Sequence, residues 1–334
     1  MADTILVTGG AGYIGSHIVV ELAGAGYTPM IVDNFATSSP SVLPRLRRLT
    51  AQPIPCVTGD IRDRALITRL FAEHPISAVI HCAGLKAVGE GEAQPIAYYD
   101  SNVGGAIVLA DAMMGAGVKT LVFSSSATVY GQPDSNPVAE DAPLRTASVY
   151  GRTKRMVERI FEDAAASDAQ WRIGLLRYFN PAGAHPSAKI GESPSTTPNN
   201  LVPMLAHAAA SGAPAIAVYG SDWNTPDGTG VRDYVHVVDL AAGHVAAMAY
   251  VKRTAGVTTL NLGTGRGHSV LEVVAAFERA CGRPIALRIA PRRPGDVAIC
   301  YADPSRARQV LGWQATRDID AICADAWRWQ VNRP

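Results

Sequence analysis

The chain has 334 residues, a hydrophobic fraction of 48% and a formal net charge of +1 at pH 7. This length suits one large or two modest domains that fold without disulfide staples. The balanced charge, with no long block of one sign, argues against a nucleic-acid-binding surface. No apolar run reaches about 18 residues and the N-terminus lacks a basic flank. We therefore expect a cytoplasmic protein with neither a membrane span nor a signal peptide.

The first half of the chain alternates short β-branched runs with stretches of helical periodicity. The runs are TILVT, PMIVDN, PIPCVTG, SAVIHCAG, KTLVFSSS and RIGLLRYF, and the helical stretches between them cover residues 13–25, 41–50, 63–74, 95–116 and 149–166. This βαβ rhythm predicts an α/β fold of the Rossmann type, a doubly wound parallel sheet that helices cover on both faces.

After about Asn180 the sequence becomes a connector rich in Pro, Gly, Ser and Asn, and we place a domain boundary there. The prediction is a first domain of residues 1–180 and a smaller α/β substrate-binding domain of residues 181–334. Beyond the connector we expect helices near 201–212, from Asp239 to about Val251, near 269–281 and at the Trp-rich C-terminus, with strands at AIAVYG and TTLNLG. The segment near 234–262 is expected to pack back onto the first domain.

The five cysteines are odd in number, widely spaced and without a C-x-x-C pair; they are Cys56, Cys82, Cys281, Cys300 and Cys323. This pattern favours reduced thiols over a disulfide framework or a zinc site. The histidines also lack metal-ligand spacing, so no metal is expected.

A glycine-rich loop, GGAGYIG, directly follows the first predicted strand and precedes a helix. Gly9 permits a tight turn, Gly12 lets the backbone approach a pyrophosphate at the helix N-terminus, and Gly15 allows close helix–sheet packing. The alternative is a tight turn without a ligand. The strand-to-helix context favours a dinucleotide site.

Two carboxylates follow the next two strands. Asp33 lies 18 residues after Gly15 at the end of the second strand. It can accept hydrogen bonds from an adenosine ribose and would repel a 2′-phosphate, which favours NAD over NADP. Asp60 and Ile61 would flank the adenine, although a loop Asp is about as often a helix cap.

Tyr150 and Lys154 lie one turn apart on the predicted helix 149–166, and Ser126 ends the fifth strand. A free tyrosine, with a pKa near 10, is a poor base at neutral pH. Lowering that pKa to about 7 requires roughly 4 kcal/mol of extra phenolate stabilisation. A nearby ammonium and the positive ring of an oxidised nicotinamide can supply it. A solvated surface pair is the alternative without the glycine loop.

Together these features resemble the extended short-chain dehydrogenase/reductase family. The longer stretches TGGAGYIGSH, HCAGLKAVGE, FSSSATVYG, LRYFNPAGAHPSA, PNNLVP, DGTGVRDYVHV and APRRPGD resemble its UDP-glucose 4-epimerase (UDP-galactose 4-epimerase) family over essentially the whole chain. The resemblance implies inversion at C4 of UDP-hexoses through a transient 4-keto sugar, with NAD that stays bound. It also implies a homodimer formed by the helices 95–116 and 149–166.

The resemblance assigns site residues position by position. In the NAD site they are Gly9, Gly12, Tyr13, Ile14, Gly15, Asp33, Asn34, Phe35, Ala36, Thr37, Ser38, Asp60, Ile61, Cys82, Ala83, Gly84, Leu85, Lys86, Ser101, Ser126, Tyr150, Lys154 and Phe179. In the UDP-sugar site they are Ser126, Tyr150, Asn180, Asn199, Asn200, Leu201, Ala217, Val218, Tyr219, Arg232, Arg293, Asp296 and Cys300. Tyr150 would accept the proton, with Lys154 and Ser126 supporting it. The two arginines suit a diphosphate, although judged alone they would be surface ion-pair residues.

Two other functions are weighed against this one. A nucleotide-sugar 4,6-dehydratase would carry acids where this chain has Ala127 and Thr128, and a non-catalytic NAD-binding protein would have lost Tyr150, Lys154 or Ser126. Cys300 stands where many bacterial members of the family have a tyrosine. A small residue there would admit a 2-acetamido group, so UDP-GlcNAc and UDP-GalNAc become candidate substrates; an ordinary buried cysteine is the alternative.

Overall fold

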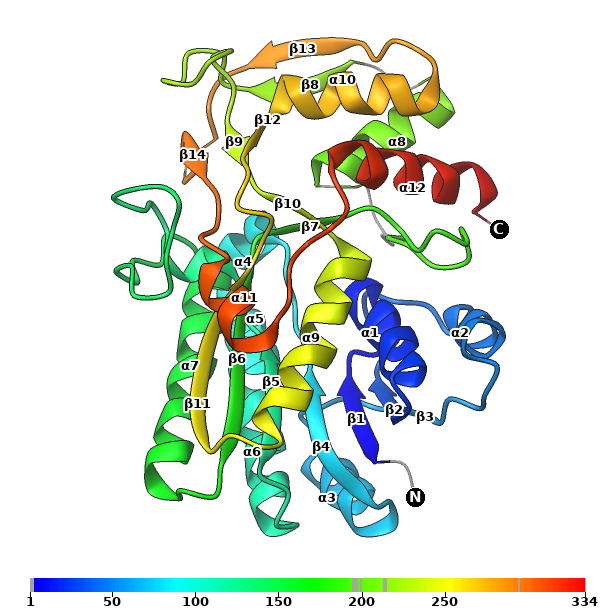
Figure 1. Ribbon diagram of the computed structural model, residues 1–334, viewed down its shortest axis with the longest axis vertical. Helices are drawn as coiled ribbons and strands as arrows, with labels where there is room; N and C mark the ends of the chain where they lie inside the picture. Colours follow the sequence, from blue (N-terminus) through cyan, green and yellow to red (C-terminus); the bar gives the residue numbers. More distant parts are fainter. Residues whose placement is uncertain (1–2, 194–197, 199, 213–214, 294, 334) are drawn as a thin grey trace.

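The computed structural model describes residues 3–193, 198, 200–212, 215–293 and 295–333, so that Asn199 lies outside the described residues. A seven-stranded, wholly parallel sheet in the order β11-β6-β5-β4-β1-β2-β3 forms the larger lobe, the lower part of Figure 1. Its strands are β1 (Thr4–Thr8), β2 (Thr28–Asp33), β3 (Cys56–Thr58), β4 (Ile76–His81), β5 (Thr120–Ser124), β6 (Arg172–Tyr178) and β11 (Gly256–Leu262). The predicted doubly wound α/β fold is confirmed.

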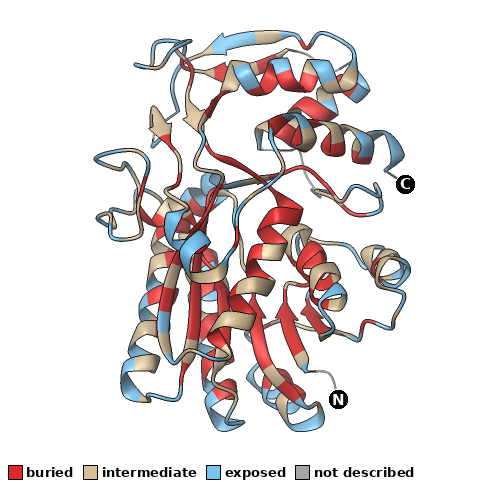
Figure 2. Cartoon of the chain, in the orientation of Figure 1, coloured by how far each residue is buried: buried red, intermediate tan, exposed pale blue. Residues whose placement is uncertain are grey.

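Helices cover both faces of this sheet because its strands alternate their side chains between two apolar cores. On β1, Ile5 and Val7 enter one core with residues of α1 and α9, whereas Leu6 enters the other with residues of α6 and α7. The helices of the first face are α1 (Tyr13–Gly24), α2 (Val42–Thr50), α9 (Val237–Val251) and α11 (Ser305–Leu311). Those of the second face are α3 (Arg64–Glu73), α6 (Gly105–Gly115) and α7 (Val149–Ser167). Figure 2 shows the strands buried and the outer helix faces exposed.

The strand order reverses between β1 and β4. The chain leaves β1 for β2 and β3 on one side, then crosses to β4, β5 and β6 on the other. In a doubly wound sheet the carboxyl ends at this reversal open a crevice that binds ligands. The glycine loop and the residues after β4 therefore face the same crevice.

The predicted continuous helix over 95–116 is wrong in detail. The chain forms the short helices α4 (Val88–Ala93) and α5 (Pro95–Tyr98), a π-helical turn η1 (Tyr99–Gly104), and then α6. Within η1 the Asn102 side chain bonds both backbone groups of Leu85, at 2.8 and 3.0 Å, and the Thr153 hydroxyl at 3.0 Å. The wider π-helical turn thus lets the Asn102 amide hydrogen-bond to the neighbouring loop and to α7. Such turns are frequent at functional sites.

The smaller lobe packs three helices around its own apolar core. They are α8 (Leu201–Ser211), α10 (Val270–Cys281) and α12 (Ile319–Asn332). Its strands are short: β8 (Ile216–Tyr219) pairs with β13 (Leu287–Ala290), and β9 (Val231–Arg232) lies between β12 (His268–Ser269) and β14 (Ile299–Cys300). Between the lobes, β7 (Asn180–Ala182) pairs with β10 (Tyr234–His236). The segment after β10 returns to the larger lobe, where α9 covers the sheet and β11 extends it.

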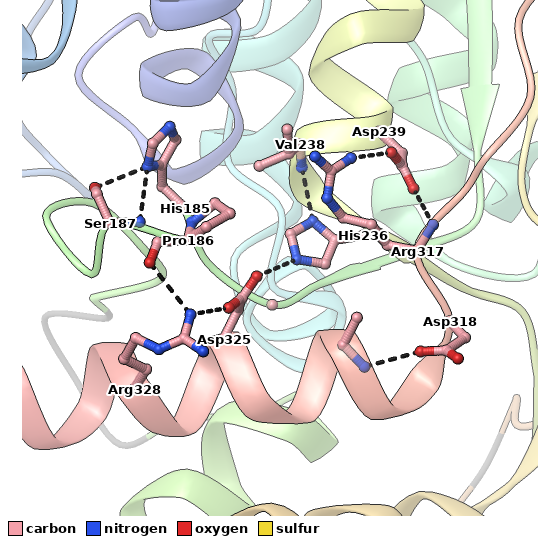
Figure 3. A network of polar contacts seen from close by, with 12 residues as sticks. His185, Pro186, Ser187, His236, Val238, Asp239, Arg317, Asp318, Asp325 and Arg328 are labelled. Atoms are coloured by element: carbon pink, nitrogen blue, oxygen red, sulfur yellow. Dashed lines mark hydrogen bonds and ion pairs between the residues drawn. The ribbon is translucent and has the colours of Figure 1, made fainter.

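A buried polar network joins the two lobes where β10 leads into α9 (Figure 3). The Val238 N–H donates to His236 Nδ1 at 3.1 Å, so the other ring nitrogen, Nε2, donates to Asp325 of α12 at 3.2 Å. One turn along α9, Asp239 accepts from the backbone N–H of Arg317 at 2.8 Å and pairs with its guanidinium. These contacts set where α12, and with it the smaller lobe, sits over the sheet.

Candidate active site

Two glycines of the loop, Gly9 and Gly15, have no space for a side chain. Gly9 has a φ of +68°, and a Cβ there would lie 2.8 Å from the Ala83 nitrogen; a Cβ on Gly15 would lie 2.2 Å from the Gly9 carbonyl oxygen. Gly12 is the N-cap of α1 and offers no side-chain cap. The first-turn N–H groups at Tyr13 and Ile14 and the positive end of the helix dipole therefore suit an anion such as a pyrophosphate.

Asp33 is held rigidly beside this loop. It is 8% exposed, and its carboxylate accepts from the Ala11 N–H at 3.0 Å, the Phe35 N–H at 2.8 Å and the Ser38 hydroxyl at 2.9 Å. Asn34, Ala36 and Thr37 complete the same loop after β2. Each carboxylate oxygen has two acceptor sites, so one site remains, on Oδ2, for a ribose hydroxyl.

Asp60 is not the cap of α3, because Asp63 performs that role by accepting from the Leu66 N–H at 3.0 Å. Asp60 instead binds the Asn34 amide at 2.8 Å and forms an ion pair with Arg62 at 2.8 Å. The hydrogen bonds from Arg62 hold the pKa of Asp60 well below its usual range. The aspartate is thus an anion that anchors the loop after β2.

The loop after β4 is fixed from both sides. The Ala83 N–H donates to the Thr8 hydroxyl at 3.3 Å, and Asn102 clamps Leu85 from η1, the turn that also carries Ser101. Gly84 leaves space for this clamp, since a Cβ there would meet the Asn102 oxygen at 2.9 Å. Lys86 pairs with Glu192 at 2.9 Å and lies 5.8 Å from the Tyr13 ring centroid.

Tyr150 is the second residue of α7, which starts where the Ser148 hydroxyl accepts from the Gly151 N–H at 3.0 Å. Lys154, one turn later, is 4% exposed and donates to the Ser124 carbonyl oxygen at 2.8 Å. Its Nζ lies 5.8 Å from the Tyr150 ring centroid. Ser126, which follows β5 and begins the 3₁₀ turn η2 (Ala127–Val129), lies against the same phenol. The three expected catalytic side chains therefore meet.

Burial governs the titration of this group. It raises the pKa of the Tyr150 phenol to about 12, against a hydrogen bond with Ser126 that lowers it. Burial also lowers the pKa of Lys154 to about 8. The protein alone thus keeps the phenol protonated at pH 7, and bringing its pKa there requires about 7 kcal/mol of added stabilisation. A cation beyond Lys154 is needed, and an oxidised nicotinamide has that charge.

Five of the expected substrate residues lie close together: Tyr219, Arg232, Arg293, Asp296 and Cys300. Arg293 Nε lies 3.3 Å from a carboxylate oxygen of Asp296, and the Arg293 guanidinium carbon lies 4.2 Å from the ring centroid of Tyr219 in β8. A guanidinium nitrogen of Arg232 lies 4.0 Å from the other Asp296 oxygen. β9 and β14 set Arg232 opposite Cys300. Of the other expected residues, Ala217 and Val218 lie in β8, Asn180 begins β7, and Leu201 begins α8. Asn200 stands at the N-cap position of α8 without a side-chain capping bond, and Phe179 and Ile61 are buried.

Cys300 packs with Phe179, Val129 and Tyr130 in a small cluster between the lobes. Its side chain is 9% exposed, and burial raises the pKa of its thiol to about 11. It is therefore a neutral side chain beside expected cofactor and substrate residues.

Several polar residues around the site were missed by the sequence analysis. Asp233 is fully buried and accepts from the N–H groups of Thr264, Gly265 and Ala302, which holds together the loops beside Arg232. Others are Asn102, Ser124, Ser125, Glu158, Arg177 and His244. Only Asp233, next to an assigned arginine in DGTGVRDYVHV, carried a signal that could have found it.

The described residues contain neither a candidate metal centre nor a helix that could span a membrane. Within those ranges no group of three or more His, Cys, Asp or Glu side chains is placed to hold a metal ion. None of the helices in that part of the chain is long and apolar enough to cross a membrane.

Comparisons with known proteins place this geometry among characterised relatives. The model of the NAD dependent epimerase/dehydratase family matches residues 5–263. The chain is 55% identical over 331 residues to UDP-glucose 4-epimerase of Neisseria meningitidis serogroup C, covering 99% of this chain and 98% of the relative. It is 52% identical over 326 residues to that of Bacillus subtilis (strain 168), covering 98% and 96%. The crystal structure of UDP-glucose 4-epimerase from Bifidobacterium longum with NAD⁺ and UDP matches with a TM-score of 0.96 at 51% identity, covering 99% of both chains.

Proposed function

The chain belongs to the NAD dependent epimerase/dehydratase family and, within it, to the UDP-glucose 4-epimerases, and from this we propose that it interconverts UDP-galactose and UDP-glucose by inverting C4. NAD is the cofactor, and the relative from Bifidobacterium longum was crystallised with NAD⁺ and UDP. The observation that carries the proposal is the buried group of Tyr150, Lys154 and Ser126 at the carboxyl ends of the strands, in the crevice that the glycine loop also enters.

Bound NAD supplies a hydride acceptor for C4 of the sugar and returns the hydride in the second half of the reaction. Tyr150, as the phenolate, removes the proton of the 4-hydroxyl and later gives it back. Ser126 donates a hydrogen bond at the same oxygen, and the Lys154 ammonium, held by the Ser124 carbonyl, stabilises the negative charge. Because burial opposes a free phenolate, this base becomes active only with the cofactor in place.

The smaller lobe holds the part of the substrate that does not react. We assign Arg232 and Arg293 to the diphosphate and Asp296, which lies near both, to a hydroxyl. If the nucleotide is gripped there and the sugar ring only loosely, the 4-keto sugar can turn and accept hydride on its other face. Firm binding remote from the reacting carbon and loose binding near it suits a ring that must occupy two poses. We therefore assign residues 1–180, with the return near 234–262, to NAD and residues 181–334 to the UDP-sugar.

The chain lacks the acidic residues that a nucleotide-sugar 4,6-dehydratase would carry at positions 127 and 128. Ala127 and Thr128 begin η2 and directly precede Val129 and Tyr130, and neither side chain is an acid that could protonate a leaving hydroxyl.

The direct test uses purified protein with UDP-galactose and no added NAD. We expect UDP-glucose to form without net reduction of nicotinamide, because each turnover regenerates the oxidised cofactor that stays bound. Product with a 4-keto-6-deoxy sugar would identify a dehydratase instead, and nucleotide binding without conversion would identify a non-catalytic protein.

We also propose that the enzyme accepts UDP-GalNAc and UDP-GlcNAc. Cys300 is small, lies in a cluster with Phe179 and opposite Arg232, and occupies less volume than a tyrosine would at this position. Cys300→Tyr should lower the ratio of kcat/KM for UDP-GalNAc to that for UDP-galactose by about tenfold or more, the usual effect of steric exclusion in a pocket. Cys300→Ser, which keeps the volume, is the matched control. An unchanged ratio in Cys300→Tyr would leave Cys300 as packing only.

The working form that we propose is a cytoplasmic homodimer. All five cysteines are free, which fits a reducing compartment. Exposed apolar side chains gather on the helices α4 to α7, with Ile96 at 78%, Ile107 at 46% and Met156 at 46% exposed. A second copy of the chain would cover this face.

A further inference from the structure

Three consecutive serines, the last residue of β5 and the two that follow it, contact three different partners. Ser124 meets His244 of α9 behind the sheet, with Oγ 2.8 Å from Nε2. Ser125 points to the other face and donates to Glu158 of α7 at 2.6 Å. Ser126 lies against Tyr150. The proposed mechanism uses only the last of these serines.

The direction of the bond between Ser124 and His244 follows from its neighbours. His244 Nδ1 lies 2.9 Å from the Leu240 carbonyl oxygen, which can only accept. The proton of the neutral ring is therefore on Nδ1, and Nε2 must accept from the Ser124 hydroxyl. That hydroxyl in turn accepts from the Cys82 thiol, whose Sγ lies 3.1 Å away. The chain of hydrogen bonds thus runs one way, from the loop after β4 through β5 to α9.

The same serine holds the catalytic lysine through its backbone. Lys154 donates to the Ser124 carbonyl oxygen at 2.8 Å, and both residues are buried, as is His244. We propose that His244 is a positioning residue for the reaction: by fixing the Ser124 side chain, it holds the Ser124 carbonyl where it keeps the Lys154 ammonium beside Tyr150. This inference rests on the proposed epimerase function, since Lys154 matters only if Tyr150 is the base.

Other ionisable groups surround this pair. Glu158 lies one turn beyond Lys154 and is paired with Arg177 at 2.9 Å; His81 and Cys82 approach from the end of β4, and Tyr98 and Tyr178 approach Tyr150 from α5 and β6. Burial lowers the pKa of His81 to about 3 and that of His244 to about 4, and it raises the pKa of Cys82 to about 11. None of these three groups changes charge between pH 5 and 9, and we assign the two limbs of the activity profile to Tyr150 and Lys154.

Three variants of the intact enzyme separate positioning from packing. Ser124→Ala removes one oxygen atom and keeps the carbonyl. His244→Gln places an acceptor near the position of Nε2, whereas His244→Asn reaches only as far as Nδ1 and cannot accept from Ser124. The last two are both polar and nearly equal in size. The measurements are the pH profile of kcat/KM for UDP-galactose, the amount of NAD bound and the melting temperature.

We expect Ser124→Ala and His244→Asn to have a narrower pH profile of kcat/KM than the unmodified enzyme, with each limb shifted inward by about one pH unit. A less firmly held ammonium stabilises the phenolate less, so the acid limb moves up, and it loses its own proton more readily, so the alkaline limb moves down. His244→Gln should keep limbs close to those of the unmodified enzyme. The proposal is wrong if the limbs of the pH profile do not move in Ser124→Ala or in His244→Asn, whatever happens to kcat or the melting temperature. It is also wrong if His244→Gln and His244→Asn have the same limbs. Ser124→Ala decides the case if His244→Asn does not fold.

A second measurement is independent of activity. In protein with ¹⁵N-labelled histidine, the His244 ring should show a proton on Nδ1 and none on Nε2 between pH 6 and 8. A proton on Nε2 would contradict the direction of the chain and with it the proposal. If the unmodified enzyme does not convert UDP-galactose, the proposed function fails on its own, while the tautomer still reports on the hydrogen-bond chain.

Discussion

The phenol oxygen of Tyr150 is the atom that accepts the proton in the proposed mechanism. Tyr150→Phe should lower kcat for UDP-galactose by about a thousandfold, in the range of positioned acid–base groups, and leave the amount of bound NAD unchanged. Tyr98→Phe is the matched control, because the Tyr98 ring packs in the same small cluster as Tyr150 while its hydroxyl donates to the Ala87 carbonyl at 2.7 Å. Its loss should reduce stability by about 1 kcal/mol and leave kcat near its original value. A Tyr150→Phe enzyme within tenfold of full activity would remove Tyr150 from the mechanism.

Lys154 should make the protein less stable while making it active. Burial lowers its pKa from 10.5 in a free side chain to about 8 in the folded chain. Between these values the unfolded chain binds more protons, so stability rises with pH, and below about pH 8 the full cost of about 3 kcal/mol applies. In nucleotide-free protein, Lys154→Met should therefore raise the free energy of unfolding by about 3 kcal/mol at pH 7. In the enzyme with NAD bound, the same change should abolish activity. The gain should shrink as the pH rises from 8 to 10.5; a constant gain would mean that packing alone caused it.

At the scale of single residues, the sequence predicted the side chains whose spacing or loop context is itself chemical. Tyr150 and Lys154 are one helical turn apart, and the structure brings them to Ser126. Their roles stay predictions. Ser124 and His244 could not be found in this way, because 120 positions separate them and a lone histidine in an apolar helix gives no sign of its partner. The raised pKa of the Tyr150 phenol was also beyond reach, since it depends on how deeply the folded chain buries the ring.

At the scale of elements, α1 contains two glycines, of which one has no space for a side chain and the other has open space around it. A Cβ on Gly15 would meet the Gly9 carbonyl at 2.2 Å, and that oxygen belongs to a backbone that cannot yield, whereas a Cβ on Gly24 meets nothing within 4 Å. Gly15→Ala should destabilise the protein by about 2 kcal/mol or more and empty it of NAD, measured by absorbance after denaturation. Gly24→Ala should keep its NAD and gain up to about 1 kcal/mol from helix propensity. Equal NAD content in the two variants would contradict the role given to the loop.

The long elements were predictable because each has a period, and the exceptions have local causes. The helices expected at 13–25, 63–74 and 149–166 appear as Tyr13–Gly24, Arg64–Glu73 and Val149–Ser167. Apolar spacing also suggested one helix over 95–116, but the Asn102 amide replaces regular helix geometry with contacts to Leu85 and Thr153. Strands such as β9 and β14 have two residues each, too few for any alternation, and they exist only because distant segments pair.

At the scale of the whole molecule, the path of the chain between lobes is what completes the site. The connector after Phe179 leads into the smaller lobe, yet β10 returns the chain to the sheet, where α9 supplies His244 behind the catalytic lysine. A composition change can suggest the exit at residue 180. It cannot show that α11, from the C-terminal part of the chain, packs on α9 and β11 of the larger lobe.

The exposed apolar face of α4 to α7 leads to the last prediction, on assembly. Ile96 is 78% exposed there, and Ile289 on β13 of the smaller lobe is 60% exposed, so the two isoleucines form a matched pair on opposite parts of the molecule. In the proposed homodimer each Ile96→Glu change occurs twice, and burying the two charges should cost about 3 kcal/mol or more, over a hundredfold in the dissociation constant. Sedimentation at micromolar concentration should show Ile96→Glu shifted toward monomer and Ile289→Glu still dimeric. If the unmodified protein sediments as a monomer, or if only Ile289→Glu dissociates, the interface lies elsewhere or does not form.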